Sequence, residues 1–479
     1  MKKSLTFVLS FLAAIILMAG FFSYIYGAFN MLSQVLKLTT ALLLYLLVAL
    51  SCYFLISKYK LKRLYIHIII FFISMSLQLL ICSNYTFLGE GDLRYYYSNA
   101  LKILEGNFSY ISLYAATFPG TVTYPTVLAA LMGMFGTSRT VAAIANCISV
   151  SFALCCIYTL LEKRINKRFL LAFCLIIPLN PYISIYSNTT NAELIFGSFI
   201  VYSITFFDKA VLEHEKTKQI LFYLLSALFL GFSLLFRPLG IILLIAYCIV
   251  MLLSVEEKVF KRIFIITLYG IVFFFLSQFN SFLVRQVTSF DAPKFSYGWN
   301  LYVGLSESGR WNQTDGKEFS EVFFHASTPT EIQEHFAQKS LDRLNTMGAH
   351  VVLHGVGKLD HWYSVDYISS QVLLEDVMAG HSMRASRNLI TILAFIFDIP
   401  IFVFGLLGCI FALIRYKKQH DIIEQLMAFY FTGSFLIFFF IELASRHTIS
   451  HHILMILPAL LFFHKFAHSI KPKISKLLL

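Results

Sequence analysis

The chain contains the stretch Arg262-Ile-Phe-Ile-Ile-Thr-Leu-Tyr-Gly-Ile-Val-Phe-Phe-Phe-Leu-Ser-Gln-Phe-Asn-Ser-Phe-Leu283, in which no charged side chain follows the initial arginine. About 20 apolar residues are enough for a helix to cross the hydrocarbon core of a bilayer. This stretch therefore predicts a transmembrane helix. Similar runs predict further spans near residues 5–27, 38–57, 65–83, 139–161, 169–187, 193–207, 219–236, 238–254, 388–414, 423–441 and 449–465.

The composition of the whole chain indicates the same class of protein. Of the 479 residues, 58% are hydrophobic and only 13% are charged, whereas soluble domains carry about 25% charged residues. The net charge of +12 would suit a nucleic-acid-binding protein, but the basic residues lie in short clusters between the apolar runs. The eight cysteines fall in or beside those runs. We expect them to pack as small side chains, without disulfides or a metal site.

The basic clusters also predict the orientation of the chain. If both termini are cytoplasmic, the short inner segments hold most of the 38 Lys and Arg residues, in keeping with the positive-inside rule. The N-terminal apolar run continues from Leu5 to about Phe29 without a clear cleavage site, so we expect a retained span. The predicted location is a bacterial plasma membrane, which the chain crosses many times.

Two longer stretches are expected on the outer face, at residues 84–138 and 284–387. They divide the chain into an N-terminal transmembrane region (1–283) that includes the loop 84–138, a small external region (284–387) and a C-terminal transmembrane region (388–479). The apolar segment from Tyr124 to Gly136 is too short to span, so it is expected to be interfacial or re-entrant.

The turn Gly89-Glu-Gly-Asp92 places two carboxylates directly after an apolar run. A carboxylate at a membrane boundary is costly unless it is solvated or paired. A helix cap at Asp92 is one interpretation, because Asp is a favoured N-cap residue. A base is the other interpretation, because a carboxylate within hydrogen-bond reach of a hydroxyl can accept its proton.

A series of external motifs follows this turn in order. They are Asp92-Leu-Arg-Tyr-Tyr-Tyr-Ser-Asn-Ala100, Tyr124-Pro125 with Phe135-Gly136, Arg237-Pro238, Gly298-Trp-Asn-Leu-Tyr-Val-Gly304, and Glu442-Leu-Ala-Ser-Arg446-His447 with Pro458. Together they resemble the GT-C-fold glycosyltransferases of the protein O-mannosyltransferase and aminoarabinose transferase-like families. Those membrane enzymes take sugars from polyprenyl-phosphate donors. The chain departs from their pattern at Thr126, where they have a second proline, and at His447, where they have tyrosine.

The resemblance implies an all-α polytopic membrane protein with a GT-C-like fold, about twelve transmembrane helices and interfacial helices in the first external loop. It implies Asp92 and Glu193 as catalytic carboxylates. The expected donor-phosphate ligands are Arg237, Arg446 and His447, since a guanidinium can bind a phosphate with two hydrogen bonds. The expected substrate contacts are Glu90, Tyr96, Tyr124, Trp299, Asn300 and Tyr302. A divalent cation, Mg²⁺ or Mn²⁺, at Asp92 is left open, because some relatives use one and others do not.

Most of these assignments have a structural alternative. Glu193 can complement the dipole of the helix it opens, and the arginines can snorkel to the headgroup region. Glu442, one helical turn before Arg446, can simply pair with it. The external Trp and Tyr residues can form an aromatic belt. The pairs His350/His354 and His447/His451 have helical spacing but lack companion metal ligands, so we expect hydrogen bonding in preference to zinc.

The sequence thus predicts a glycosyltransferase, a hexosyl- or pentosyltransferase. It would move a sugar from an undecaprenyl-phosphate-type donor to a cell-envelope glycopolymer or lipid on the outer face, with inversion. A flippase or exporter of lipid-linked sugars is the alternative. Transporters tend to carry ionisable residues near the middle of the membrane. Here the spans are nearly free of charge, which favours chemistry at the outer surface.

Overall fold

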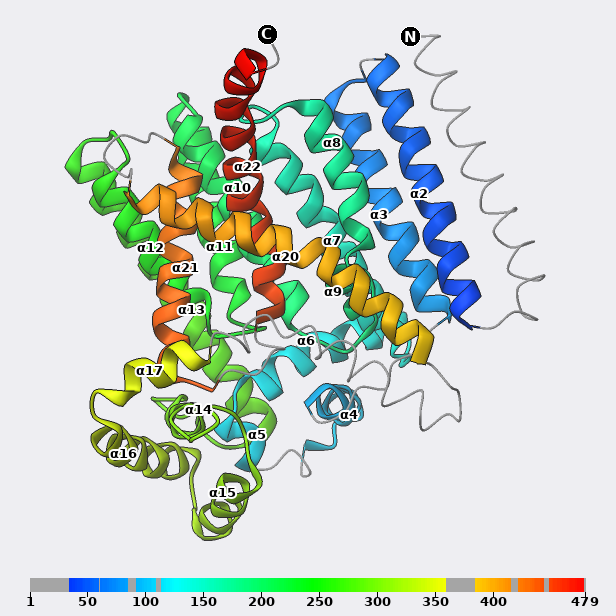
Figure 1. Cartoon of the computed structure of the whole chain (residues 1–479). Helices are drawn as coiled ribbons and strands as arrows, with labels where there is room; N and C mark the ends of the chain where they lie inside the picture. The colour runs from blue at the N-terminus through cyan, green and yellow to red at the C-terminus, as the bar shows by residue number, and fades with distance from the viewer. Residues whose placement is uncertain are drawn as a thin grey trace.

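The computed structural model describes residues 34–59, 61–84, 92–108, 113–358, 384–414, 421–442 and 448–477. All regular elements within these ranges are helices, and none of the described residues forms a β-strand. The predicted all-α fold is confirmed. Figure 1 shows the long helices side by side, with a group of short helices gathered at their lower end.

The long helices coincide with the predicted spans. Seven of the described helices are long and apolar enough to cross a membrane, or eight if a bent pair is counted as one span. The predicted span 5–27 lies outside the described residues. The helices at the predicted spans are α2 (Gln34–Tyr59), α3 (Arg63–Asn84), α7 (Thr140–Leu161), α10 (Glu193–Leu212), α11 (Lys216–Ser233), α12 (Gly240–Leu253), α13 (Val259–Thr288), α20 (Arg384–Ile414), α21 (Ile422–Phe440) and α22 (Ile449–Leu477). Of these, α12 falls among the apolar helices shorter than a span.

The predicted span 169–187 is broken. It consists of α8 (Lys167–Ile176), the 3₁₀ turn η2 (Ile177–Leu179), α9 (Pro181–Ser184) and the 3₁₀ turn η3 (Tyr186–Asn188), with a bend of 65°. Prolines at positions 178 and 181 explain the break, because each removes a backbone donor and clashes with the preceding turn. The chain then runs, buried, from residue 187 to the start of α10.

The short helices belong to the two regions predicted to be external. The first region contributes α4 (Asp92–Leu104), α5 (Leu113–Thr117) and α6 (Gly120–Phe135), and the second contributes α14 (Gly298–Gly304), α15 (Gln313–His325), α16 (Pro329–Met347) and α17 (His350–Gly357). Helix α6 falls among the apolar helices shorter than a span, as predicted for the segment from Tyr124. Both groups lie at the lower end in Figure 1.

The opposite end of the helices is held together by ion pairs. Arg164, just after α7, lies 2.6 Å from Asp208 on α10 and 2.9 Å from Asp421 at the start of α21. Glu162 also pairs with Arg63 at 2.7 Å. Because one guanidinium joins three helices, this end has a fixed arrangement, and it is the end that carries the short basic loops.

Candidate functional site

The centre of the candidate site is an ion pair between Glu193 and Arg237. Glu193 is the first residue of α10, and the side chain of Asn191, two residues earlier, accepts a hydrogen bond from the backbone N–H of Leu194 at 3.1 Å in the first turn. Arg237 follows the end of α11 and precedes Pro238, which cannot continue a helix. The Glu193 side chain is only 2% exposed, so its carboxylate is removed from water and paired.

Two buried polar atoms beside this pair have no hydrogen-bond partner among the described residues. They are Oε2 of Glu193 and the hydroxyl of Tyr124. Buried polar atoms are nearly always hydrogen-bonded, and each exception in a folded protein calls for an explanation. A bound hydroxyl or water at this point would satisfy both atoms, because it can donate to the carboxylate oxygen and accept from the phenol. The arrangement is therefore suited to receiving a polar ligand.

Tyr124 is brought to the ion pair by helix α6. Its ring lies 5.4 Å from that of Tyr96 on α4 and 6.2 Å from that of Phe236, the residue before Arg237. The hydroxyl of Thr123 donates to the carbonyl of Leu235 at 2.9 Å, which fixes α6 against the end of α11. Burial raises the pKa of Tyr124, and the nearby Glu193 carboxylate and Tyr96 raise it further. The phenol therefore keeps its proton and remains a hydrogen-bond donor.

Helix α4 begins at Asp92, four residues before Tyr96. Residues four apart share one face of a helix, so the backbone places Asp92 one turn from the aromatic contact with Tyr124. The side chain of Asp92 lies outside the described part of the structure, as do Glu90, Arg446 and His447. Their predicted roles stay predictions.

The start of α22 also packs beside this site. A Cβ atom on Gly197, four residues after Glu193, would lie 3.2 Å from the backbone and side chain of Ser450. A side chain at this position would make a tighter contact than packed helices usually have, so the glycine favours the close approach of the two helices. The sequence motif that ends at Pro458 thus continues in α22, whose start packs against α10, the helix that carries Glu193.

The motif from Gly298 to Gly304 docks against the end of α21. The backbone N–H of Glu442 donates to the carbonyl of Asn300 at 2.7 Å. A Cβ atom on Gly304 would lie 2.2 Å from backbone atoms of Phe440 and Ile441, so glycine is required there. Two of the sequence motifs therefore meet in space.

Lys358 joins the two sides of this junction by hydrogen bonds. Its ammonium donates to the carbonyl of Gly304 at 2.9 Å, to that of Phe439 at 3.1 Å and to that of Ile441 at 2.9 Å. Burial lowers the pKa of Lys358 to about 8, and the nearby Glu442 opposes this effect. The charged form fits the junction, because three carbonyl oxygens take all three of its hydrogens.

Trp299 and Tyr302 lie in the core of the small helical region. Trp299 is 8% exposed and Tyr302 is 5% exposed, and both pack on Phe336 of α16. The Tyr302 hydroxyl donates to Glu318 at 2.5 Å, and the Arg343 guanidinium lies 3.4 Å from the centre of the Tyr302 ring. Neither ring offers an open face for a sugar in this arrangement. Their predicted role in substrate binding is untested, and their packing is that of structural residues.

Sequence reasoning missed a second buried polar cluster, inside the helix bundle. Asp398 of α20 accepts a hydrogen bond from Asn180 at 2.8 Å and lies 3.1 Å from Nδ1 of His452. The His452 ring stacks on that of Tyr182 at 4.0 Å. Asn180 sits at the break between η2 and α9, so the cluster connects the broken span to α20 and α22. The sequence feature that indicates this cluster is Asp398, an isolated charged residue within the predicted span 388–414.

Among the described residues, no group of three or more His, Cys, Asp or Glu side chains has the arrangement of a metal site. The two histidines with helical spacing that are both described, at positions 350 and 354, do not join such a group. His354 instead lies 3.0 Å from the carbonyl of Gly304. The side chain of Asp92, where a divalent cation was left open, lies outside the described part of the structure.

Residues 121–281, about a third of the chain, match the family described as dolichyl-phosphate-mannose-protein mannosyltransferase. Tyr124, Glu193 and Arg237 all fall within the match. This match confirms the class of protein predicted from the motifs, a glycosyltransferase of the GT-C type. No curated protein matches the chain.

Two solved structures are among those similar to this chain. The oligosaccharyltransferase of Archaeoglobus fulgidus in its apo form is 14% identical, with a TM-score of 0.46 over 88% of this chain and 52% of that one. ArnT of Cupriavidus metallidurans, bound to undecaprenyl phosphate, is 13% identical, with a TM-score of 0.37 over 86% of this chain and 80% of that one. The chain therefore spans about half the length of the archaeal protein. Similarity at this level carries no conclusion about activity.

Proposed function

We propose that the protein is a membrane glycosyltransferase that moves a sugar from a polyprenyl-phosphate donor to an acceptor hydroxyl. The observation that carries the proposal is the buried Glu193–Arg237 ion pair, flanked by the unpartnered Tyr124 hydroxyl and Glu193 Oε2. The match of residues 121–281 to a mannosyltransferase family supports the same reaction class.

Arg237 is the proposed ligand for the donor phosphate. Its side chain is 17% exposed, so it is less enclosed than the Glu193 carboxylate with which it pairs. Breaking a buried ion pair is costly, and the pair therefore holds Arg237 in one orientation before the donor arrives. Glu193 is thus a positioning residue in this proposal, because its Oε1 is already engaged by Arg237. The Tyr124 hydroxyl would donate to an oxygen of the donor.

Asp92 is the proposed base. The acceptor oxygen attacks the anomeric carbon, the bond from that carbon to the phosphate oxygen breaks, and the configuration inverts. The acceptor proton passes to the Asp92 carboxylate, and the electron pair of the broken bond leaves with the polyprenyl phosphate. Arg237, together with Arg446 and His447, would stabilise the negative charge that develops on that phosphate. A divalent cation at Asp92 would serve the same purpose.

The proposed setting is the outer face of a bacterial plasma membrane. The short helices α4 and α6 and the ion pair lie at one end of the bundle, and the basic loops around Arg164 lie at the other. The positive-inside rule assigns the basic end to the cytoplasm. The proposed donor is of the undecaprenyl-phosphate type, and the proposed acceptor is a glycopolymer or lipid of the cell envelope.

Release of free polyprenyl phosphate tests the proposal. The purified full chain is given undecaprenyl-phosphate hexoses and pentoses, together with envelope glycopolymer and lipid acceptors. We expect Asp92→Asn to lower the release rate by about 10²–10⁴-fold, the usual contribution of a positioned base. Asp291→Asn is the matched control, because that carboxylate is 81% exposed and should leave the rate unchanged.

Two results would contradict the proposal. One is release at the wild-type rate by a well-folded Asp92→Asn variant, which would remove the base. The other is movement of labelled donor between the leaflets of a vesicle without cleavage, which would establish a flippase in place of a transferase.

A further inference from the structure

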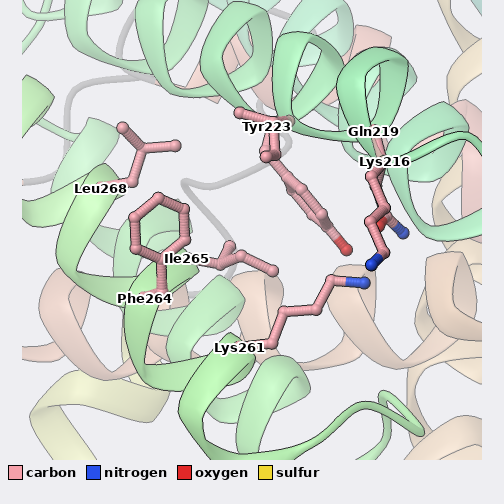
Figure 2. A pocket seen from close by; sticks show the side chains of 8 residues that line it. Lys216, Gln219, Tyr223, Lys261, Phe264, Ile265 and Leu268 are labelled. Atoms are coloured by element: carbon pink, nitrogen blue, oxygen red, sulfur yellow. The ribbon is translucent and has the colours of Figure 1, made fainter.

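A pocket lies between α11 and α13, at the end of the bundle opposite Arg237. Its volume is about 180 Å³, and its lining includes Lys216, Tyr223, Lys261 and Phe264. Figure 2 shows the two lysine ammonium groups and the Tyr223 hydroxyl pointing toward one another across it. The volume is several times the roughly 30 Å³ that one water occupies in the liquid. The pocket is therefore large enough for more than a solvent molecule.

The positive charge of the pocket has two sources. Lys216 is the first residue of α11, and Lys261 lies in the first turn of α13, so both helices present their N-terminal ends here. The N-terminus of a helix carries partial positive charge and favours anions. Lys216 makes no ion pair within the described part of the chain. Lys261 pairs with Glu257 at 2.5 Å, and this carboxylate also lies near Tyr223, so the unpaired positive charge of the pocket comes from Lys216 and the two helix N-termini.

Tyr223 supplies an independent sign that the pocket holds a ligand. Its side chain is 1% exposed, and its hydroxyl has no hydrogen-bond partner among the described residues. The adjacent Gln219 does not satisfy it: the Gln219 amide nitrogen donates to the carbonyl of Ala210 at 2.9 Å and reaches Glu257 at 3.5 Å, and no hydrogen bond joins Gln219 to the phenol. A buried phenol of this kind calls for an acceptor. An anion lying between the two lysines would supply one.

The remaining walls are apolar and open to the outer surface of the bundle. Phe264 is 55% exposed, Ile220 is 49% exposed, and Leu268 continues the wall along α13. Helix α13 turns little of its surface toward the other helices, since only 11% of its most apolar stretch is buried. An apolar chain can therefore run along α13 while a charged group stays at the lysines.

We propose that this pocket binds an anionic phospholipid of the leaflet opposite the transfer site. The lipid phosphate lies between Lys216 and Lys261 and accepts a hydrogen bond from the Tyr223 hydroxyl, and an acyl chain lies against Phe264 and Leu268. A free phosphate would match the lysines but would leave the apolar wall uncovered. This site is separate from the proposed transfer site and does not depend on it.

Lipid retention measured by native mass spectrometry tests the proposal. The purified full chain is equilibrated with phosphatidylglycerol or phosphatidylcholine, and the bound lipid is counted. We expect phosphatidylglycerol to be retained in preference to phosphatidylcholine. Lys216→Gln and Lys261→Gln should each weaken its retention by about fivefold, the effect of one lysine near an anionic surface. Tyr223→Phe should weaken it by a few-fold through the lost hydrogen bond.

Lys218→Gln is the matched control, because this lysine is on the same helix and 58% exposed but does not line the pocket. It should retain phosphatidylglycerol as the wild type does. Lys216→Gln removes an exposed side chain and keeps the test valid if the Lys261 variant does not fold. Equal retention by Lys216→Gln and Lys218→Gln would overturn the proposal. Equal retention of the two lipids, or displacement of the lipid by millimolar inorganic phosphate, would also overturn it.

Discussion

The proposed transfer site and the small helical region from α14 to α17 both bury tyrosines beside an arginine–carboxylate pair, but they differ in how fully the polar atoms are satisfied. Beside Arg237, the Tyr124 hydroxyl and Glu193 Oε2 have no partner among the described residues. In the helical region, the Tyr302 hydroxyl donates to Glu318, and both oxygens of Asp315 accept from Arg343. Completed hydrogen bonding indicates a structural role, and incomplete hydrogen bonding indicates a place for a ligand.

The largest expected effect concerns the ion pair itself. Arg237→Met leaves the Glu193 carboxylate buried without its partner, which should lower the free energy of unfolding by about 3–5 kcal/mol. The double variant Glu193→Gln/Arg237→Met should recover much of this loss, because no charge remains buried. Unfolding in detergent, followed by helix content, measures both. Additive losses in the double variant would show that the two residues do not act as a pair.

The next effect concerns the junction of α14 with α21. Gly304→Ala places a Cβ atom 2.2 Å from the Phe440 and Ile441 backbone, so the helices must separate. We expect a loss of about 1–3 kcal/mol, the usual cost of overpacking. Gly270→Ala is the control, since nothing lies within 4 Å of its Cβ atom and it should be neutral or stabilising. Equal unfolding midpoints for the two variants would rule out close docking at Gly304.

A smaller effect depends on pH and on Lys358. Its pKa is about 8 in the folded protein against 10.5 for an ordinary lysine. Between these values the unfolded chain holds a proton that the folded protein has released, so stability rises with pH in that window. Relative to Lys358→Met, the wild type should gain about 1 kcal/mol per pH unit there. A flat difference between the two proteins from pH 8 to pH 10 would contradict the lowered pKa.

The smallest effect separates packing from sugar binding at Trp299. Trp299→Phe keeps an aromatic ring in the core, so it should cost about 1 kcal/mol of stability and leave the rate of polyprenyl phosphate release unchanged. A folded variant with a strongly reduced release rate would instead establish Trp299 as a sugar contact, as the sequence motif suggests.

The sequence predicts the helices well because hydrophobic length alone identifies a span. The segment 139–161 corresponds to α7, and the shortness of the segment after Tyr124 correctly excluded a span there. The bend at Asn180 was not predicted, because a proline near the end of an apolar run is compatible with either a kink or a boundary.

The sequence predicts which residues belong to the candidate site, but not which of them are in contact. Glu193 and Arg237 were recognised separately, as a carboxylate and a phosphate ligand. That they pair directly depends on how α10 and α11 pack, which periodicity does not encode. Burial of Trp299 was missed for the same reason, since an aromatic residue in a polar loop has the same pattern in a core as on a surface.

The most direct test of the account is the variant Tyr124→Phe. Its hydroxyl has no partner among the described residues, so its removal should leave the unfolding midpoint unchanged or slightly raised. If the hydroxyl donates to the donor phosphate or sugar, its loss should lower kcat/KM for polyprenyl phosphate release by about 10- to 100-fold. A folded Tyr124→Phe variant that releases polyprenyl phosphate at the wild-type rate would contradict the placement of the transfer site beside Glu193 and Arg237.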